Sequence, residues 1–98
     1  MQTAFITGAS SGIGRATAVA LGRAGFRLVL AGRRRERLEE LAQELAEVPT
    51  HILTFDVRDQ AAVDAAVASL PAAFQDIDVL INNAGNAHGL APIQAGDV

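Results

Sequence analysis

Hydrophobic residues along the chain follow two alternating patterns, short continuous runs and longer stretches with helical spacing. Continuous runs are typical of strands that are buried on both faces of a parallel sheet. They predict four strands, at residues 3–7, 27–31, 51–55 and 78–82. The stretches between them predict three helices, at residues 13–24, 35–47 and 60–74, the last ended or kinked by Pro71. Strands that alternate with helices predict an α/β fold with a parallel sheet.

This alternation stops after Asn83, where the sequence AGNAHGLAPIQAGDV has the glycine, proline and asparagine content of a loop. A Rossmann-type doubly wound sheet normally has two βαβαβ halves. Residues 1–98 have room for the first half and one further strand. We therefore expect them to form the N-terminal part of a single Rossmann-fold domain, with about four strands and three helices.

Composition narrows the classes of function. The net charge of −3 provides no overall basic field that would attract nucleic acid. Cysteine is absent, which excludes disulfides and thiolate metal sites, and we predict no metal site of another kind. No apolar run approaches the roughly 20 residues that span a bilayer, and no basic region of a secretory signal follows Met1. We therefore expect a cytoplasmic protein without a membrane or nucleic-acid partner.

A glycine-rich turn, TGASSGIG at residues 7–14, joins the first predicted strand to the first predicted helix. Gly8 can turn sharply because it lacks a Cβ, Gly12 lets the backbone approach a bound group, and Gly14 allows tight packing of helix on strand. The N–H groups and the dipole at the start of the helix favour a pyrophosphate. Three glycines can also form a tight turn and nothing more, but the dinucleotide-binding fingerprint requires this position between a strand and a helix.

Consecutive arginines, Arg33 to Arg35, stand where the second helix is predicted to begin. Cations are unfavourable at a helix N-terminus, so their presence predicts an anionic ligand. NAD-binding units carry an acidic residue about 20 residues beyond the glycine motif, where it binds the ribose 2′-hydroxyl. The corresponding positions here are Ala31, Gly32 and Arg33, without a carboxylate. Gly32 leaves space for a 2′-phosphate that Arg33 can bind, with Arg34 as the second clamp, which predicts NADP as the cofactor.

The alternative for these arginines is a solvated helix start that is neutralised by the glutamates of the same helix. We prefer the alternative for Arg35 and Arg37. For Arg33 and Arg34 we prefer ligand binding, because no carboxylate stands at the position where an NAD-binding unit carries one.

Three motifs together resemble the short-chain dehydrogenase/reductase family: the glycine turn, the pair DV at residues 56–57 and the sequence NNAG at residues 82–85. The segments GRRRERL, DVRDQAAV and ASLPAAF are further similar to bacterial NADP-dependent serine/3-hydroxy acid dehydrogenases of this family. The resemblance covers the whole chain and implies the N-terminal, cofactor-binding part of such an enzyme. It implies an NADP-dependent oxidoreductase that acts on an alcohol/carbonyl pair of a small molecule, such as a 3-hydroxy acid or serine, and that forms a homo-oligomer.

The resemblance also implies roles for single residues. Asp56 would bind the amino edge of the adenine, although it can also be a simple turn residue at the end of a strand. Asn82 would tie the fourth strand to the loop after Thr7. Ser11 is uncharged where some NADP-preferring members have a basic residue, so specificity would depend on the arginines alone. The complete predicted cofactor set is Gly8, Ser10, Ser11, Gly12, Ile13, Gly14, Arg33, Arg34, Asp56, Val57, Asn83, Ala84 and Gly85.

Catalytic residues are not assigned to this chain. The resemblance implies a catalytic tyrosine whose pKa is lowered by a lysine, in a Tyr-x-x-x-Lys arrangement. All eight basic residues are arginine and tyrosine is absent, so neither partner occurs in the chain. It would then supply cofactor binding only, as part of an NADP-dependent oxidoreductase.

The alternative is a stand-alone nucleotide-binding half-domain without catalysis. The predicted fourth strand has an apolar edge with no protecting charge beyond Asp78, which favours the first hypothesis. On that hypothesis, residues 1–98 by themselves aggregate or bind NADPH weakly.

Overall fold

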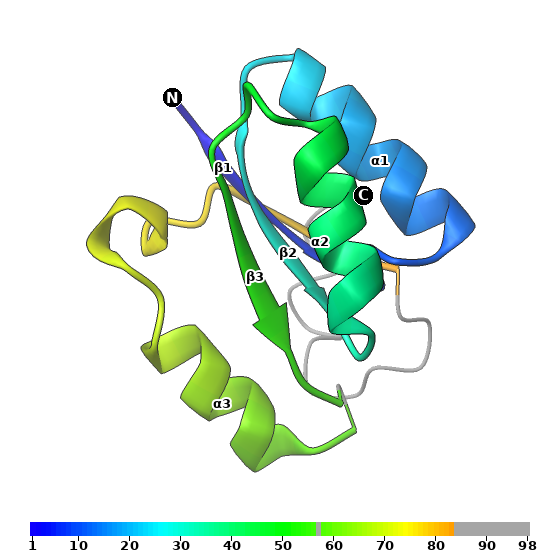
Figure 1. The fold of residues 1–98 in the computed structure, drawn as a ribbon. Helices are drawn as coiled ribbons and strands as arrows, with labels where there is room; N and C mark the ends of the chain where they lie inside the picture. The colour runs from blue at the N-terminus through cyan, green and yellow to red at the C-terminus, as the bar shows by residue number, and fades with distance from the viewer. Residues whose placement is uncertain (57, 84–98) are drawn as a thin grey trace.

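The computed structural model describes residues 1–56 and 58–83, which form a parallel sheet with helices on both of its faces (Figure 1). This arrangement confirms the predicted α/β, Rossmann-type fold. In chain order the elements are β1 (Thr3–Thr7), α1 (Gly12–Arg23), β2 (Arg27–Gly32), α2 (Arg35–Glu44), β3 (Thr50–Thr54), α3 (Gln60–Ala68), the 3₁₀ helix η1 (Ala72–Phe74) and β4 (Val79–Asn82).

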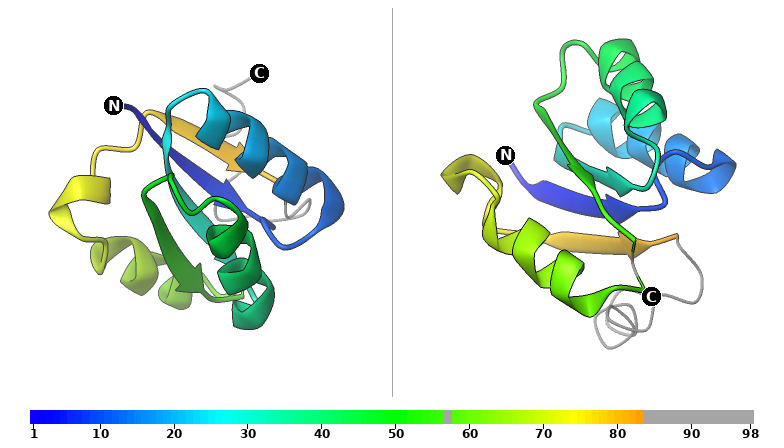
Figure 2. Two further views of the ribbon diagram at one scale, coloured as in Figure 1. Left: turned by 45° about the horizontal axis from the view of Figure 1, so that its top comes forward. Right: turned by 60° about the horizontal axis from the view of Figure 1, so that its bottom comes forward.

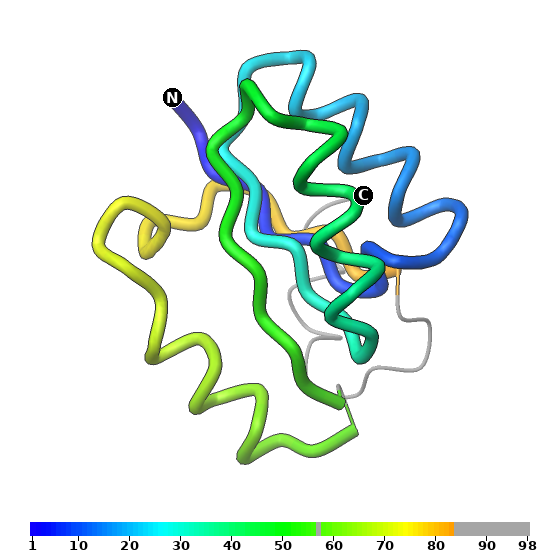
Figure 3. The backbone as a smooth tube through the Cα atoms, viewed as in Figure 1, coloured from blue at the N-terminus to red at the C-terminus, as the bar shows by residue number. Residues whose placement is uncertain are grey.

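The strand order of the sheet is β3-β2-β1-β4, and all neighbours are parallel. β1 is central: Phe5 lies opposite Val29 of β2 on one side and Leu80 of β4 on the other. The chain therefore adds strands first to one side of β1 and then, after α3, to the other, as the tube in Figure 3 shows. In sheets of this kind, ligands bind at the carboxyl ends of the strands where the order reverses.

Helices α1 and α2 cover one face of the sheet, and α3 covers the other (Figure 2). Successive residues of a strand point to opposite faces, so β1 contributes Ala4 and Ile6 to one core and Phe5 to the other. All five residues of β1 are buried, which explains why its sequence is a continuous run rather than an alternating one.

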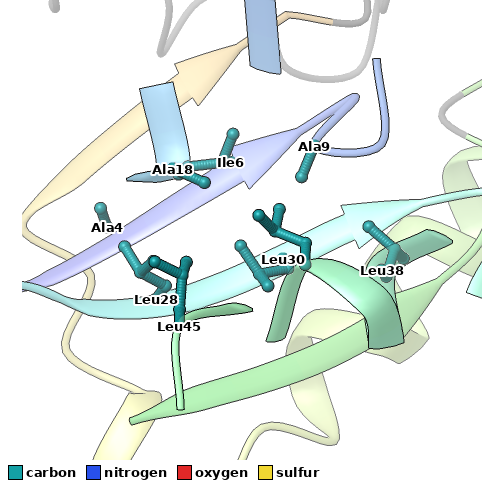
Figure 4. Packing of buried hydrophobic residues seen from close by; sticks show 9 residues of the cluster. Ala4, Ile6, Ala9, Ala18, Leu28, Leu30, Leu38 and Leu45 are labelled. Atoms are coloured by element: carbon teal, nitrogen blue, oxygen red, sulfur yellow. The ribbon is translucent and has the colours of Figure 1, made fainter. Parts of the chain in front are cut away.

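The first core joins the strands to α1 and α2 and consists largely of alanine and leucine (Figure 4). Leu28 and Leu30 of β2 meet Leu38 and Leu41 of α2, and all four are fully buried. Small residues on the facing helix, such as Ala18, let α1 approach the sheet closely. The second core is centred on Phe5, Val29, Leu53, Phe55, Val63 and Leu80.

Helix α1 ends one residue before its predicted end, and the other two helices end three or more residues early. α3 ends at Ala68 rather than at residue 74, because Pro71 takes an extended conformation with ψ of 156° and a short 3₁₀ turn follows it. α2 ends at Glu44 rather than at residue 47, since Leu45 leaves the helical conformation while its side chain stays in the first core. Among the described residues, no helix has both the length and the apolar character that crossing a bilayer requires.

Candidate functional site

An open pocket of about 620 Å³ lies at the carboxyl edge of the sheet. This volume is in the range of pockets that bind small molecules and cofactors. Its lining comes from the segments that follow all four strands, so the parallel sheet itself brings the pocket together. The lining residues are Gly8, Ser10, Ser11, Gly32, Arg33, Arg34, Arg37, Phe55, Asp56, Arg58 and Asn83.

The glycine turn between β1 and α1 is fixed by backbone constraints at two of its glycines. Gly8 has a φ of 63°, a left-handed conformation that disfavours a side chain. A Cβ at Gly14 would overlap the carbonyl oxygen of Gly8, so α1 can lie this close to β1 only with glycine at that position. At Gly12, by contrast, a Cβ would meet nothing within 4 Å. Packing among the described residues therefore does not require glycine at position 12. This agrees with the expectation that Gly12 leaves space for a ligand to approach the backbone.

Helix α1 opens towards this edge without a side-chain cap. Ser11 is the N-cap residue, but its hydroxyl donates to the carbonyl oxygen of Gly8 at 2.8 Å and accepts no bond from the helix. The first turn of α1 also contains no acidic residue. At α3 the chain does supply a cap, since the carboxylate of Asp59 accepts from the amide of Ala62 at 3.2 Å. The first amides of α1 are thus available to an external anion.

Three arginines give the pocket a positive wall. Arg33, Arg34 and Arg37 line it, and none of them forms an ion pair with any described residue. Arg35 lies outside the pocket and is neutralised by Glu39, with 3.2 Å between Nε and Oε2. The local sequence therefore pairs one member of the arginine run with a carboxylate and leaves the pocket-facing members without one.

Gly32 ends β2 next to these arginines and is buried. A Cβ there would lie 3.5 Å from Oγ of Ser10 and 3.6 Å from a methyl group of Leu38, which are ordinary contact distances. Its φ is not positive, so neither the backbone nor the packing requires glycine at this position. The absence of a side chain leaves open the place where a carboxylate would otherwise stand beside Arg33.

Asp56 follows β3 and is held by Arg58. Oδ1 of Asp56 accepts from the backbone amide of Arg58 at 2.9 Å and from its Nε at 3.1 Å, and Oδ2 accepts from Nη2 at 2.8 Å. The side-chain and then the backbone hydrogen bonds of Arg58 hold the pKa of the Asp56 carboxyl well below its usual range, with a smaller contribution from the charge of Arg33. Asp56 is therefore an ionised hydrogen-bond acceptor at neutral pH.

The end of β4 completes the site. The hydroxyl of Thr7 donates to Oδ1 of Asn82 at 2.9 Å and so connects β4 to the end of β1. The sequence analysis expected Asn82 to bond the loop that follows Thr7, whereas this bond is made by Thr7 itself. Asn83 lines the pocket, and its buried amide nitrogen has no hydrogen-bond acceptor among residues 1–56 and 58–83. A buried donor of this kind costs free energy unless a ligand or another group accepts its hydrogen bond.

The structure brings seven members of the predicted set together in the pocket wall: Gly8, Ser10, Ser11, Arg33, Arg34, Asp56 and Asn83. Gly12, Ile13 and Gly14 form the first turn of α1 beside it, and Ile13 is 75% exposed. Val57, Ala84 and Gly85 lie outside the described residues.

Three lining residues were missed by the sequence analysis: Arg37, Phe55 and Arg58. For Arg37 the helical period held a signal, because it follows Arg34 by three residues and so lies on the same side of the helix. For Arg58 no comparable signal exists, since only the turn after β3 folds its side chain back to Asp56. The described residues contain no cluster of side chains that could hold a metal ion.

Comparison with known proteins agrees with this geometry. The family described as short chain dehydrogenase matches residues 2–97. The chain belongs to this family. Among its relatives are a sulfoacetaldehyde reductase of Chromohalobacter salexigens, 58% identical over 93% of the chain, and a serine 3-dehydrogenase of Agrobacterium fabrum, 50% identical over 92%. An NADP-dependent 3-hydroxy acid dehydrogenase of Salmonella typhimurium is 45% identical over 96%. Relatives of the type expected from the sequence motifs are thus found, together with the sulfoacetaldehyde enzyme.

The chain spans 36% to 38% of the length of these short chain dehydrogenases. Among solved structures, a serine dehydrogenase in its closed form, complexed with NADP⁺, superposes with a TM-score of 0.76 at 38% identity. That match covers 81% of this chain and 32% of the other.

The two glycines of the first turn of α1 are expected to respond differently to substitution. Gly14→Ala places a Cβ on the Gly8 carbonyl, so we expect the free energy of unfolding to fall by about 2 to 3 kcal/mol. Gly12→Ala meets no atom, so stability should stay the same or rise slightly, while affinity for a dinucleotide falls at least about fivefold. Urea unfolding and calorimetric titration of the intact gene product measure both effects. A Gly14→Ala variant with unchanged stability would contradict the packing argument.

Proposed function

We propose that this chain is the NADP(H)-binding part of an oxidoreductase that acts on an alcohol/carbonyl pair. The observation that carries the proposal is the positive pocket wall beside Gly32: Arg33, Arg34 and Arg37 line it without an ion pair to any described residue, while the acid in the wall, Asp56, is paired with Arg58. An NAD-binding site would present an acidic side chain to the ribose 2′-hydroxyl at this place. Guanidinium groups instead suit a 2′-phosphate, which they can bind with charge-assisted, bidentate hydrogen bonds.

The remaining parts of the pocket suit the rest of the dinucleotide. The uncapped start of α1, with Gly12, Ile13 and Gly14, would hold the pyrophosphate together with Ser10 and Ser11. In this proposal Asp56 and Val57 receive the adenine, and Asn83, Ala84 and Gly85 follow the adenosine ribose. When bound, the nicotinamide cofactor supplies the hydride for a carbonyl reduction. The chain itself contains no tyrosine and no lysine, so its contribution is to bind and orient the cofactor.

The substrate class follows from a feature that the named substrates of three relatives share. In sulfoacetaldehyde, serine and 3-hydroxy acids, one carbon atom separates the reacting carbonyl or hydroxyl carbon from an acidic group. This acidic group is a sulfonate or a carboxylate. We infer that the substrate of this protein has the same arrangement. The serine-like or 3-hydroxy acid substrate expected from the sequence is one member of this wider class.

The alternative is a nucleotide-binding half-domain without catalysis, in which the same pocket would serve as a sensor or carrier site. The two differ in one observable: the oxidoreductase oxidises NADPH when a carbonyl substrate is added, whereas the half-domain binds NADPH without turnover. A cytoplasmic location, a homo-oligomeric state and the absence of a nucleic-acid partner remain predictions of the sequence analysis.

Cofactor preference tests the arginine wall. In the intact gene product, the paired substitution Arg33→Asp and Arg34→Ala should raise the KM for NADPH about 100-fold, since two charge-assisted contacts are lost, and change the KM for NADH less than about threefold. Arg35→Ala is the matched control, because Arg35 belongs to the same helix but is paired with Glu39 outside the pocket. Steady-state rates with sulfoacetaldehyde give the KM values. Equal effects on both cofactors would refute the assignment.

Gly32 offers a second test that separates charge from volume. The Cβ of Gly32→Asp meets its neighbours at ordinary contact distances. The substitution adds a carboxylate at the residue before Arg33, so affinity for NADP⁺ should fall at least about tenfold while affinity for NAD⁺ is kept or raised. Gly32→Asn has nearly the same shape without the charge and should reduce NADP⁺ affinity much less. Calorimetric titration of both variants decides the point, and equal losses for aspartate and asparagine would show that volume, not charge, sets the preference.

A further inference from the structure

The contacts between Asp56 and Arg58 point to a role for Arg58. We propose that Arg58 is a positioning residue: it fixes the carboxylate of Asp56 as an acceptor for one hydrogen bond from the adenine amino group, and so makes the site prefer adenine over a 6-oxo purine. The proposal deepens the proposed function and rests on it, because it assumes that a dinucleotide occupies the pocket. Arg58 belongs to the pocket wall, directly beside the residue that it holds.

A count of the acceptor positions on Asp56 supports this role. An ionised carboxylate offers about four lone-pair positions, two on each oxygen. Oδ1 of Asp56 accepts two hydrogen bonds from Arg58, one from its amide and one from Nε, whereas Oδ2 accepts one from Nη2. Once the donors of the described residues are counted, one acceptor position remains, and it lies on Oδ2. Arg58 decides which oxygen has the open position and holds the carboxylate plane in place.

The turn after β3 keeps Arg58 in this place. The carbonyl oxygen of Asp56 accepts from the amide of Asp59 at 2.9 Å, which keeps Asp59, and with it the neighbouring Arg58, close to Asp56. The neighbouring acid, Asp59, is engaged as the cap of α3. Among the described residues the ion pair of Arg58 is therefore made with Asp56, and the other charge that acts on this carboxylate is Arg33.

This arrangement contributes little to the stability of the fold. The Arg58 side chain is 71% exposed, and exposed ion pairs add little to the free energy of unfolding. A charged residue that only keeps the surface soluble needs no fixed partner, whereas Arg58 donates three hydrogen bonds to one carboxylate in the wall of the pocket. The consequence is geometric, because three hydrogen bonds restrict the rotation of this carboxylate, whereas a free carboxylate rotates.

The fixed acceptor distinguishes purine bases by their 6-substituent. Adenine presents an N–H donor at that position, which satisfies the open position on Oδ2. Hypoxanthine presents a carbonyl oxygen instead, which a carboxylate repels. Without the Arg58 side chain, Asp56 keeps only the hydrogen bond from the backbone amide of residue 58, so its carboxylate can rotate away from the carbonyl oxygen and the penalty against the 6-oxo base becomes smaller.

Three ligands test the proposal on the intact gene product: NADPH, NADH, and the deamino form of NADPH, in which hypoxanthine replaces adenine. Dissociation constants are measured for the natural protein, Arg58→Met and Arg58→Lys. Arg35→Met is the matched control, because it removes another exposed, ion-paired arginine from outside the pocket. Thermal unfolding of each variant establishes that the fold is kept.

We expect Arg58→Met to reduce the preference for NADPH over deamino-NADPH about fivefold, the effect of one hydrogen bond, while the preference for NADPH over NADH stays within about twofold. Arg58→Lys should restore part of the base preference, since an ammonium can hold one carboxylate oxygen but not both. An unchanged base preference in Arg58→Met would overturn the proposal. So would a loss of NADPH-over-NADH preference, which would assign Arg58 to the 2′-phosphate instead. If the natural protein binds none of the three ligands, the proposed function fails, which is a different outcome from either.

Discussion

The central place of β1 in the sheet is the constraint on which the site depends. Parallel pairing on both sides sets Thr7 opposite Ala31 of β2 and Asn82 of β4, so the three strands end level with one another. The segments that leave these ends must then lie side by side at one edge. Burial of β1 on both faces fixes this register, because a slip by one residue would move Phe5 into the wrong core. The hydrophobic pattern of five residues thereby positions a polar site.

Unpaired positive charge gives that site its chemical character. Arginines at the start of α2 repel one another and oppose the helix dipole, and an anion between them relieves both effects. Two arginines outside the pocket are paired with glutamates: Arg15 of α1 with Glu44 of α2, and Arg35 with Glu39. Asp56 is the acid at the pocket, and its carboxylate is engaged by Arg58. The distribution of acids leaves the part of the pocket wall formed by Arg33, Arg34 and Arg37 positive.

The fold was predictable because strand burial and helix spacing leave direct patterns in the sequence. β1 was predicted with its observed bounds, and the other strands within one residue at each end. The helix ends were harder to predict from the sequence, since Leu45 leaves α2 for a core position that only the tertiary packing defines. For the site, Gly8 and Gly14 were predictable from their backbone and packing requirements. Arg58 was not, because whether it faces solvent or the pocket depends on how its turn lies against the sheet, and for Arg37 the helical spacing from Arg34 was the available signal.

The central claim is that this pocket recognises the extra phosphate of NADP. Adenosine 2′,5′-bisphosphate and AMP carry the same base and 5′-phosphate and differ by the 2′-phosphate alone. Their dissociation constants for the intact gene product, measured by calorimetry at several salt concentrations, test the claim without a nicotinamide or a reaction. The account predicts that the bisphosphate binds at least about tenfold more tightly and that the difference shrinks as salt screens the arginines. Equal affinities at low salt would contradict it.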